Sequence, residues 1–171
     1  GAEAITTIRI AFSNSNLGAG APFSVHVYED PDDDGNPSTG PLQLVASASA
    51  TVTDPTGASF QDIAIGPATV SGGFFVAALM THPGGSYPAT FDQSASASSS
   101  WLAGALAAVI DPGDPFASLV IGPGLVDSFG FPGNFLLRAV AGRQEIEAIP
   151  ALGLSGLALL VAALGVAGVL V

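Results

Sequence analysis

The sequence contains no cysteine and no lysine, and its only permanent cations are three arginines. Without cysteine the chain forms no disulfide, and it offers no thiolate for catalysis or metal binding. Three arginines cannot build the basic surface that nucleic acids require, and 14 Asp and Glu residues bring the formal net charge to −11. We therefore expect no nucleic-acid partner.

Charged residues of either sign are also scarce. They make up 10% of the chain, whereas 49% of its residues are hydrophobic. Intrinsic disorder requires the opposite balance, low hydrophobicity with high charge. The 171 residues are enough for one domain with a real core and for an appendage.

Charge is absent altogether from residues 148–171, which read AIPALGLSGLALLVAALGVAGVLV. As a helix, residues 151–171 would be roughly 31 Å long, close to the hydrocarbon thickness of a bilayer. Pro150 suits the first turn of such a helix. Because the helix would be apolar on every side, lipid or protein must cover all of it. A buried helix of the preceding domain is the weaker interpretation, since the segment is long and uniform.

Small residues recur along this segment, which we call the apolar tail. Ala158, Ala162, Gly165 and Gly168 would form notches that let neighbouring helices approach closely. They are the predicted assembly contacts, with sister chains as the expected partners in a homo-oligomer or polymer. Membrane lipid is the alternative partner for the same surface.

The residues before the tail favour β structure. Apolar and polar residues alternate in short segments, and 22 Gly and 13 Pro supply the turns between them. The predicted strands lie within residues 5–13, 23–29, 42–52, 58–65, 72–80, 102–110 and 134–142. Asp54–Pro55, Gly66–Pro67 and Asp111–Pro112–Gly113 are among the predicted turns. This pattern predicts a mainly β class, a β-sandwich or jelly-roll-like domain over residues 1–147, followed by one long hydrophobic α-helix over residues 148–171.

One acidic segment has the spacing of a cation-binding loop. Asp30, Asp32 and Asp34 alternate and are followed by Gly35 and Asn36, as in the first half of a D-x-D-x-D-G calcium loop. Position twelve is proline rather than glutamate, which excludes an EF-hand. We predict Ca²⁺ ligands in the side chains of the three aspartates and the carbonyl of Asn36. The alternative is a solvated acidic hairpin loop.

Other candidate sites are weaker. Trp101, with Tyr87 and Phe91 nearby in the sequence, suggests a sugar-stacking platform, although packing is the commoner role of such residues. His26 and His82 have no sequence partner, and a solvated or hydrogen-bonded role is expected for His26. No nucleophile elbow or phosphate-binding loop occurs, so we do not expect an enzyme.

The residues Ile149-Pro150-Ala151-Leu152, followed by the apolar segment, resemble a bacterial C-terminal sorting signal of the PEP-CTERM class and its IPTL-type relatives. Three of these four positions match the Ile-Pro-Thr-Leu form, while the Ser-Glu-Trp that often follows is absent. The preceding region resembles the β-sandwich ectodomains that carry such tails. The matching pieces are Tyr28-Glu29-Asp30, Gly72–Val76, Asp92 before Ser100-Trp101, and Gly133–Ala139. The resemblance implies export and an extracellular or cell-surface location, without a defined activity.

Two functions follow from these patterns. The first is a structural subunit of an extracellular filament or surface assembly, which polymerises through the apolar tail and keeps acidic β domains outside. The second is a membrane-anchored surface β-sandwich that binds glycan or calcium through its loops. We favour the first, because the small residues of the tail suit helix–helix contact.

Overall fold

A computed structural model describes residues 2–13, 17–83, 88, 90–95, 97–105, 110–117 and 119–142. This part of the chain is mainly β, as predicted, with ten strands and one short 3₁₀ helix. In chain order the elements are β1 (Glu3–Ile10), β2 (Pro22–Glu29), β3 (Gln43–Thr51), β4 (Gln61–Val70), β5 (Phe74–Met80), β6 (Phe91–Asp92), β7 (Trp101–Gly104), β8 (Ile121–Leu125), η1 (Val126–Phe129), β9 (Asn134–Phe135) and β10 (Leu137–Ala141).

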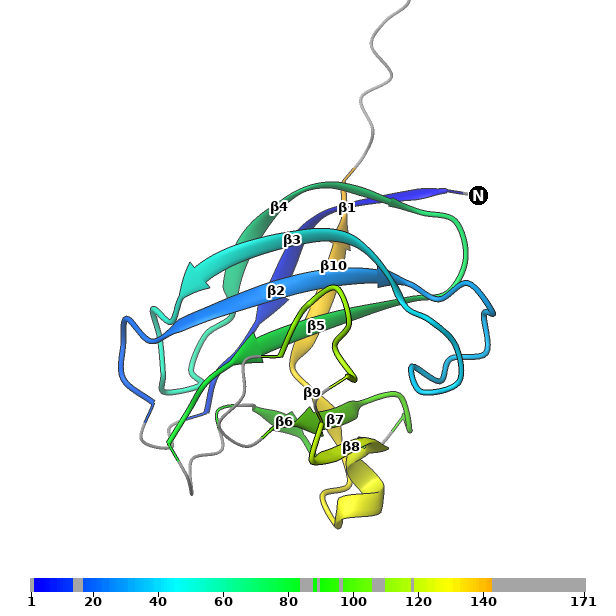
Figure 1. The fold of residues 1–171 in the computed structure, drawn as a ribbon. Coiled ribbons are helices and arrows are strands. Elements are labelled where there is room, and N and C mark those ends of the chain that lie inside the picture. The colour runs from blue at the N-terminus through cyan, green and yellow to red at the C-terminus, as the bar shows by residue number, and fades with distance from the viewer. Residues whose placement is uncertain are drawn as a thin grey trace, which may run out of the picture.

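Two three-stranded antiparallel sheets form the body of the domain, in a sandwich-like arrangement (Figure 1). One has the order β10-β1-β4 and the other has the order β3-β2-β5. Their apolar side chains meet in a single core, in which Ile8 of β1 and Val25 and Val27 of β2 are fully buried. Burial of this apolar surface is the main force that holds the two sheets together.

β1 places apolar residues on the core at uneven spacing. Ile5 and Ile8 are both buried, although residues three apart point to opposite faces of a regular strand. The register with both neighbouring strands shifts between Ile5 and Thr7. This irregularity rotates the second half of the strand, so that Ile8 and Ile10 join Ile5 in the core.

Two smaller antiparallel sheets, β6-β9 and β7-β8, lie beyond the first residues of β10 (Figure 1). Ser100 links them, because its hydroxyl accepts a hydrogen bond from the Phe135 amide at 3.0 Å and its carbonyl accepts one from the Val126 amide at 3.0 Å. β10 therefore starts beside the small sheets and ends at Ala141 on the other side of the domain.

The structure corrects the predicted boundaries at three places. Gly66–Pro67 is not a turn, because β4 continues through it with shifted register to Val70. Residues 121–125, for which no strand was predicted, form β8. Of the predicted strand at 102–110, the described part is strand only up to Gly104, in β7.

The predicted helix over residues 148–171 lies outside the described residues, which end at Gly142. Within the part of the chain that the structure describes, no helix has the length and apolar character needed to cross a bilayer.

Candidate metal site in the acidic loop

The acidic loop, residues 30–36, begins where the buried central strand β2 ends. Tyr28 is 2% exposed and Asp30 is 3% exposed. The first aspartate of the loop is therefore buried. The Asp30 amide donates to the Gly73 carbonyl at 2.9 Å, and the Asp30 carbonyl accepts from the Asp33 amide at 3.1 Å. These bonds fix the tight turn that follows β2.

The three predicted aspartates converge. One carboxylate oxygen from each of Asp30, Asp32 and Asp34 lies within 4.8 Å of the others. Calcium binds oxygen ligands at about 2.3–2.6 Å, so oxygens at this separation can reach one ion. The donor set therefore fits a hard divalent cation, with the buried Asp30 as the fixed ligand and the exposed Asp32 and Asp34 as the adjustable ones.

Asn36 is placed differently from the three aspartates. Its carbonyl accepts from the Thr39 hydroxyl at 2.9 Å, and its side-chain oxygen accepts from the Ser38 amide at 3.0 Å. The backbone amide of Asn36 donates to the Asp34 carboxylate at 2.7 Å. Asn36 therefore shapes the turn that holds Asp34, and its role as a direct ligand stays a prediction.

The carboxylates of the loop repel one another. A hydrogen bond to Asp30, a small desolvation effect and the charges of Asp34 and Asp30 raise the pKa of Asp32 above its usual value. The two arginines among the described residues lie elsewhere: Arg9 pairs with Asp62 at 2.6 Å, and Arg138 stacks on the Phe60 ring at 5.0 Å. Within this part of the chain, no arginine lies at the loop, and its carboxylates accept hydrogen bonds from donors such as the Gly35 amide and the Thr39 hydroxyl.

Two further acidic residues, Asp33 within the loop and Glu29 just before it, have roles that the sequence pattern missed. Asp33 accepts a hydrogen bond from the Gly73 amide at 2.7 Å, and Glu29 accepts from the Ser71 amide and hydroxyl at 3.0 and 2.7 Å. The Ser71 donors lower the pKa of Glu29. A pocket of about 300 Å³ opens here, lined by Glu29, Asp30, Pro31, Asp33, Gln43, Ser71 and Gly72. No local signal links Asp33 to Gly73, because the contact requires β5 to pair with β2.

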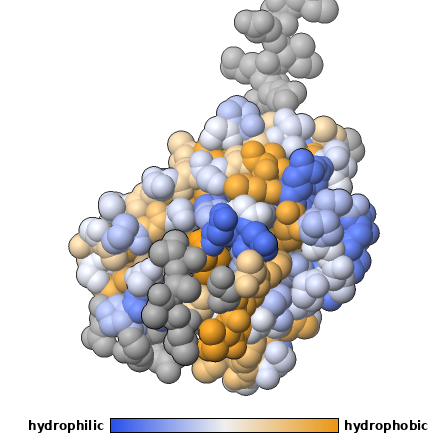
Figure 2. All heavy atoms as spheres, in the orientation of Figure 1, coloured by the Kyte–Doolittle hydropathy of each residue, from blue (hydrophilic) through white to orange (hydrophobic). Residues whose placement is uncertain are grey.

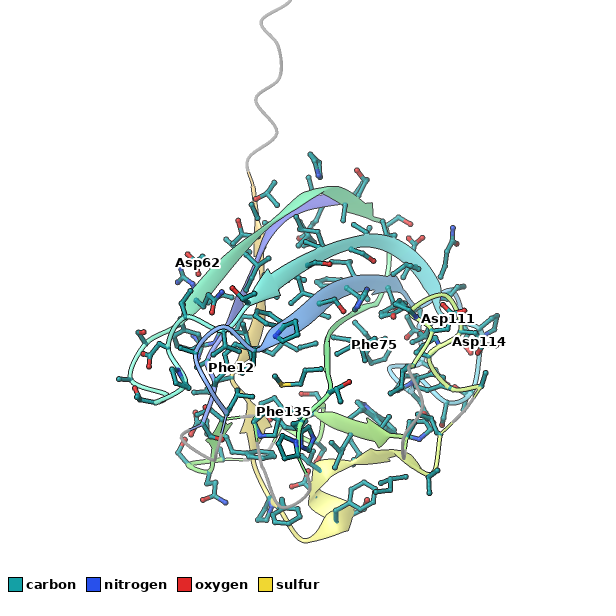
Figure 3. All side chains as sticks on the ribbon, turned by 60° about the vertical axis from the view of Figure 1, so that its left-hand side comes forward. Phe12, Asp62, Phe75, Asp111, Asp114 and Phe135 are labelled. Carbon is teal, nitrogen blue, oxygen red and sulfur yellow. The ribbon has the colours of Figure 1, made fainter. Side chains whose placement is uncertain are left out.

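A second acidic turn approaches the same end of β2. The Tyr28 hydroxyl donates to the Pro112 carbonyl at 2.9 Å, which holds the turn that contains Asp111 and Asp114 against the outer face of the sheet. Figure 3 shows both aspartates beside Phe75, the residue that pairs with Tyr28 on β5. Burial and the charge of Asp111 raise the pKa of Tyr28 to about 12.

The residues of the weaker candidate sites have structural contacts. His26 is 2% exposed and bonds Ser24 and Ser47 at 2.8 Å each, so it is a hydrogen-bonded buried histidine rather than a solvated one. Burial lowers its pKa. Phe91 packs against Phe135, with 4.5 Å between the ring centroids. Trp101 of β7 lies opposite Leu125 of β8. Tyr87 lies outside the described residues, so the sugar platform stays untested.

The predicted assembly residues Ala158, Ala162, Gly165 and Gly168 also lie outside the described residues. The comparisons with known proteins add no family: no family model, curated protein or solved structure matches the chain.

Proposed function

We propose that the chain is a structural subunit of an extracellular filament or surface assembly, held together by its apolar tail. The observation that carries the proposal is the completeness of the domain core. Ile5, Ile8, Val25 and Val27, from both large sheets, are at most 1% exposed, and side chains of the two sheets pack around them. We infer that the tail is not needed to fill this core and that it requires another apolar environment.

The energetic reason is simple. A helix of this length, apolar on all sides, exposes on the order of 1,500 Å² of hydrocarbon, which at about 25 cal/mol per Å² amounts to tens of kcal/mol. A domain stability of about 5–15 kcal/mol cannot offset that exposure. Sister tails bury one another, and the small residues from Ala158 to Gly168 allow their backbones to approach closely.

The distribution of charge supports the outside position of the domains. All charged residues precede residue 148, and the formal net charge is −11. Domains that repel one another stay soluble at the periphery, while uncharged tails gather inside. Export to the cell surface is part of the proposal and is supported by the resemblance of the tail to PEP-CTERM-type sorting signals. The proposal assigns the chain no catalytic activity.

Truncation of the tail tests this proposal. Removal of residues 150–171 should leave a folded monomer that no longer sediments as an assembly. Ala162→Leu or Gly165→Leu in the full chain should weaken assembly, because each fills a notch, whereas Leu159→Ile is the matched control outside the notches. If the truncated chain assembles as the full chain does, the domain itself carries the polymer and the tail is only an anchor.

Cation binding by the acidic loop is a second candidate function. The convergence of Asp30, Asp32 and Asp34 favours it, and a bound Ca²⁺ would relieve the repulsion among them. Cation binding by the loop is compatible with a tail buried by sister chains and with a tail buried by lipid. A glycan-binding role for Trp101 has no comparable support.

A further inference from the structure

The region of β7, β8 and η1 exposes an unusual share of apolar side chains. Among the described residues, the exposed large apolar side chains number eight, and five of them lie here. They are Leu102, Val120, Ile121, Phe129 and Phe131, which we call the distal apolar face. Val120 is 62% exposed and Ile121 is 46% exposed. Figure 2 shows apolar residues gathered over this lower end of the molecule.

Backbone pairing brings these side chains together. Leu102 lies opposite Gly124, and the ring of Phe129 lies so close to Gly124 that a Cβ there would be 2.9 Å from it. Ile121 lies opposite Gly104, whose carbonyl accepts from the Val120 amide at 2.8 Å. The side chains of Phe129 and Ile121 thus lie next to Gly124 and Gly104, and the exposed apolar side chains gather on one surface that can pack against an apolar segment.

The distal apolar face and the last described residues, which end at Gly142, lie at opposite ends of the domain. β10 begins at Leu137, next to the small sheets, and its last residue, Ala141, pairs with Ile5 near the start of β1. Its five residues cover about 16 Å in the direction away from the face. In Figure 1, β10 runs upward from the small sheets, and β7, β8 and η1 lie at the bottom.

We propose that the distal apolar face receives the apolar tail of a neighbouring copy, so that copies join head to tail. The inference rests on the proposed function, because it names the surface on which a sister tail packs. A contact between two different surfaces at opposite ends is heterologous, so it joins copies head to tail, and it gives a filament where the rotation between copies does not close a ring. The tail of the next copy is apolar on every side, so it packs on this face and on sister tails at once.

The tail of the same chain is the poorer occupant. Residues 143–147 span at most about 18 Å when extended. The chain would have to turn back and run the length of the domain, over the outer side of the β10-β1-β4 sheet. That side carries the exposed Arg9–Asp62 ion pair and Arg138, which an uncharged apolar helix would desolvate without compensation.

The absence of cysteine allows a direct test by cross-linking. Chains with Val120→Cys are mixed with chains with Ala162→Cys, assembled, and treated with a short bismaleimide. We expect a dimer that contains one chain of each kind, and much less of it with Ser49→Cys, an exposed residue on β3, in place of Val120→Cys. If Ala162→Cys links only to itself, tails pack without the face, and this inference is wrong while the proposed function stands.

The doubly substituted chain distinguishes the two occupants. With Val120→Cys and Ala162→Cys in one chain, dilution into excess unsubstituted chain should abolish cross-linking, because each substituted chain then has unsubstituted neighbours. A cross-link that survives dilution would show that each tail folds onto its own domain. As a second readout, Ile121→Asn should raise the critical concentration for assembly about tenfold, because it removes a buried aliphatic contact. Leu44→Asn, exposed on β3, should leave it unchanged. A chain that does not assemble at all refutes both the inference and the proposed function.

Discussion

Many carboxylates of this protein are satisfied by hydroxyl and amide donors instead of cations. Asp54 accepts from the Thr56 amide and hydroxyl at 2.9 and 2.6 Å and from the Ser59 hydroxyl at 2.6 Å. Asp92 accepts from the amide and hydroxyl of Ser94 at 3.0 and 2.6 Å. With three arginines for 14 acidic residues, such local turns are the means of holding negative charge in place.

The Asp54 turn makes stability depend on pH in a defined direction. Its donors lower the pKa of Asp54 from 3.8 to about 2. Because the folded state favours the ionised form, this contribution is present above pH 3.8 and is lost as the pH falls toward 2. Asp54→Ala should therefore lower the melting temperature at neutral pH, and the difference should shrink at pH 2. An equal difference at both pH values would contradict this role.

The acidic loop should respond to calcium. A ligand that binds only the folded state raises its stability, so calcium should raise the melting temperature of the full chain and a chelator should reverse the rise. Asp32→Asn should reduce the shift, and Glu3→Gln, which removes an equal charge outside the loop, should not. Because the pKa of Asp32 is raised, protons should compete with calcium and weaken binding as the pH falls. If neither calcium nor chelator changes the melting curve, the loop is a solvated acidic hairpin and not a calcium site.

Residue spacing predicted only the local part of this site. The D-x-D-x-D-G pattern correctly brought Asp30, Asp32 and Asp34 together, since alternate residues of a tight turn share one side. The bonds from Gly73 to Asp33 and from Ser71 to Glu29 join residues about 40 positions apart, and no periodicity encodes them. The hydrogen bond between His26 and Ser47 was missed for a related reason, because it joins residues 21 positions apart that only the pairing of β2 with β3 brings together.

At the scale of elements, the central strands carry most of the stability. β1 and β2 each have a partner on both sides, and they supply four of the six described core side chains that are at most 1% exposed: Ile5, Ile8, Val25 and Val27. Their apolar alternation was readable because one face of each strand must be buried. The prediction did not include the register shift between Ile5 and Thr7 of β1, which brings Ile5 and Ile8 into the same core.

The position of Ile8 makes a quantitative prediction. Ile8 is fully buried between Ile63 and Ala139 on the neighbouring strands. Ile8→Ala should lower the free energy of unfolding by about 2–4 kcal/mol, because it removes buried methyl groups and leaves a cavity. Denaturant titration measures this change. Val140→Ala on the exposed side of β10 is the control, with an expected loss under about 1 kcal/mol, and a similar loss in both variants would contradict the assigned core.

Glycine and proline misled the prediction of elements. Both residues mark turns in most sequences, but Gly66–Pro67 lies at a register shift inside β4, an outer strand of its sheet, where proline's missing amide costs no ladder bond. Gly122 has φ +70 within β8, a backbone conformation that favours glycine. Strands with such irregularities have no clear alternation, so only their partners reveal them.

At the scale of the whole molecule, acidic residues and exposed apolar residues lie in different regions. Acidic loops surround one end of β2, the distal apolar face covers the small sheets, and the uncharged tail follows the last strand. The tail is distinguished by composition alone, because its 24 residues carry no charge. The distal apolar face was not predictable, since its five members come from three segments that only the small sheets bring together.

Electron microscopy of the purified full chain, in buffer without lipid or detergent, tests the central claim most directly. The account predicts regular fibres with the β domains at their periphery, and it predicts dispersed particles for the chain that lacks residues 150–171. Single domains on the surface of added vesicles, with no fibres in their absence, would show that lipid covers the tail and would contradict a tail-driven polymer.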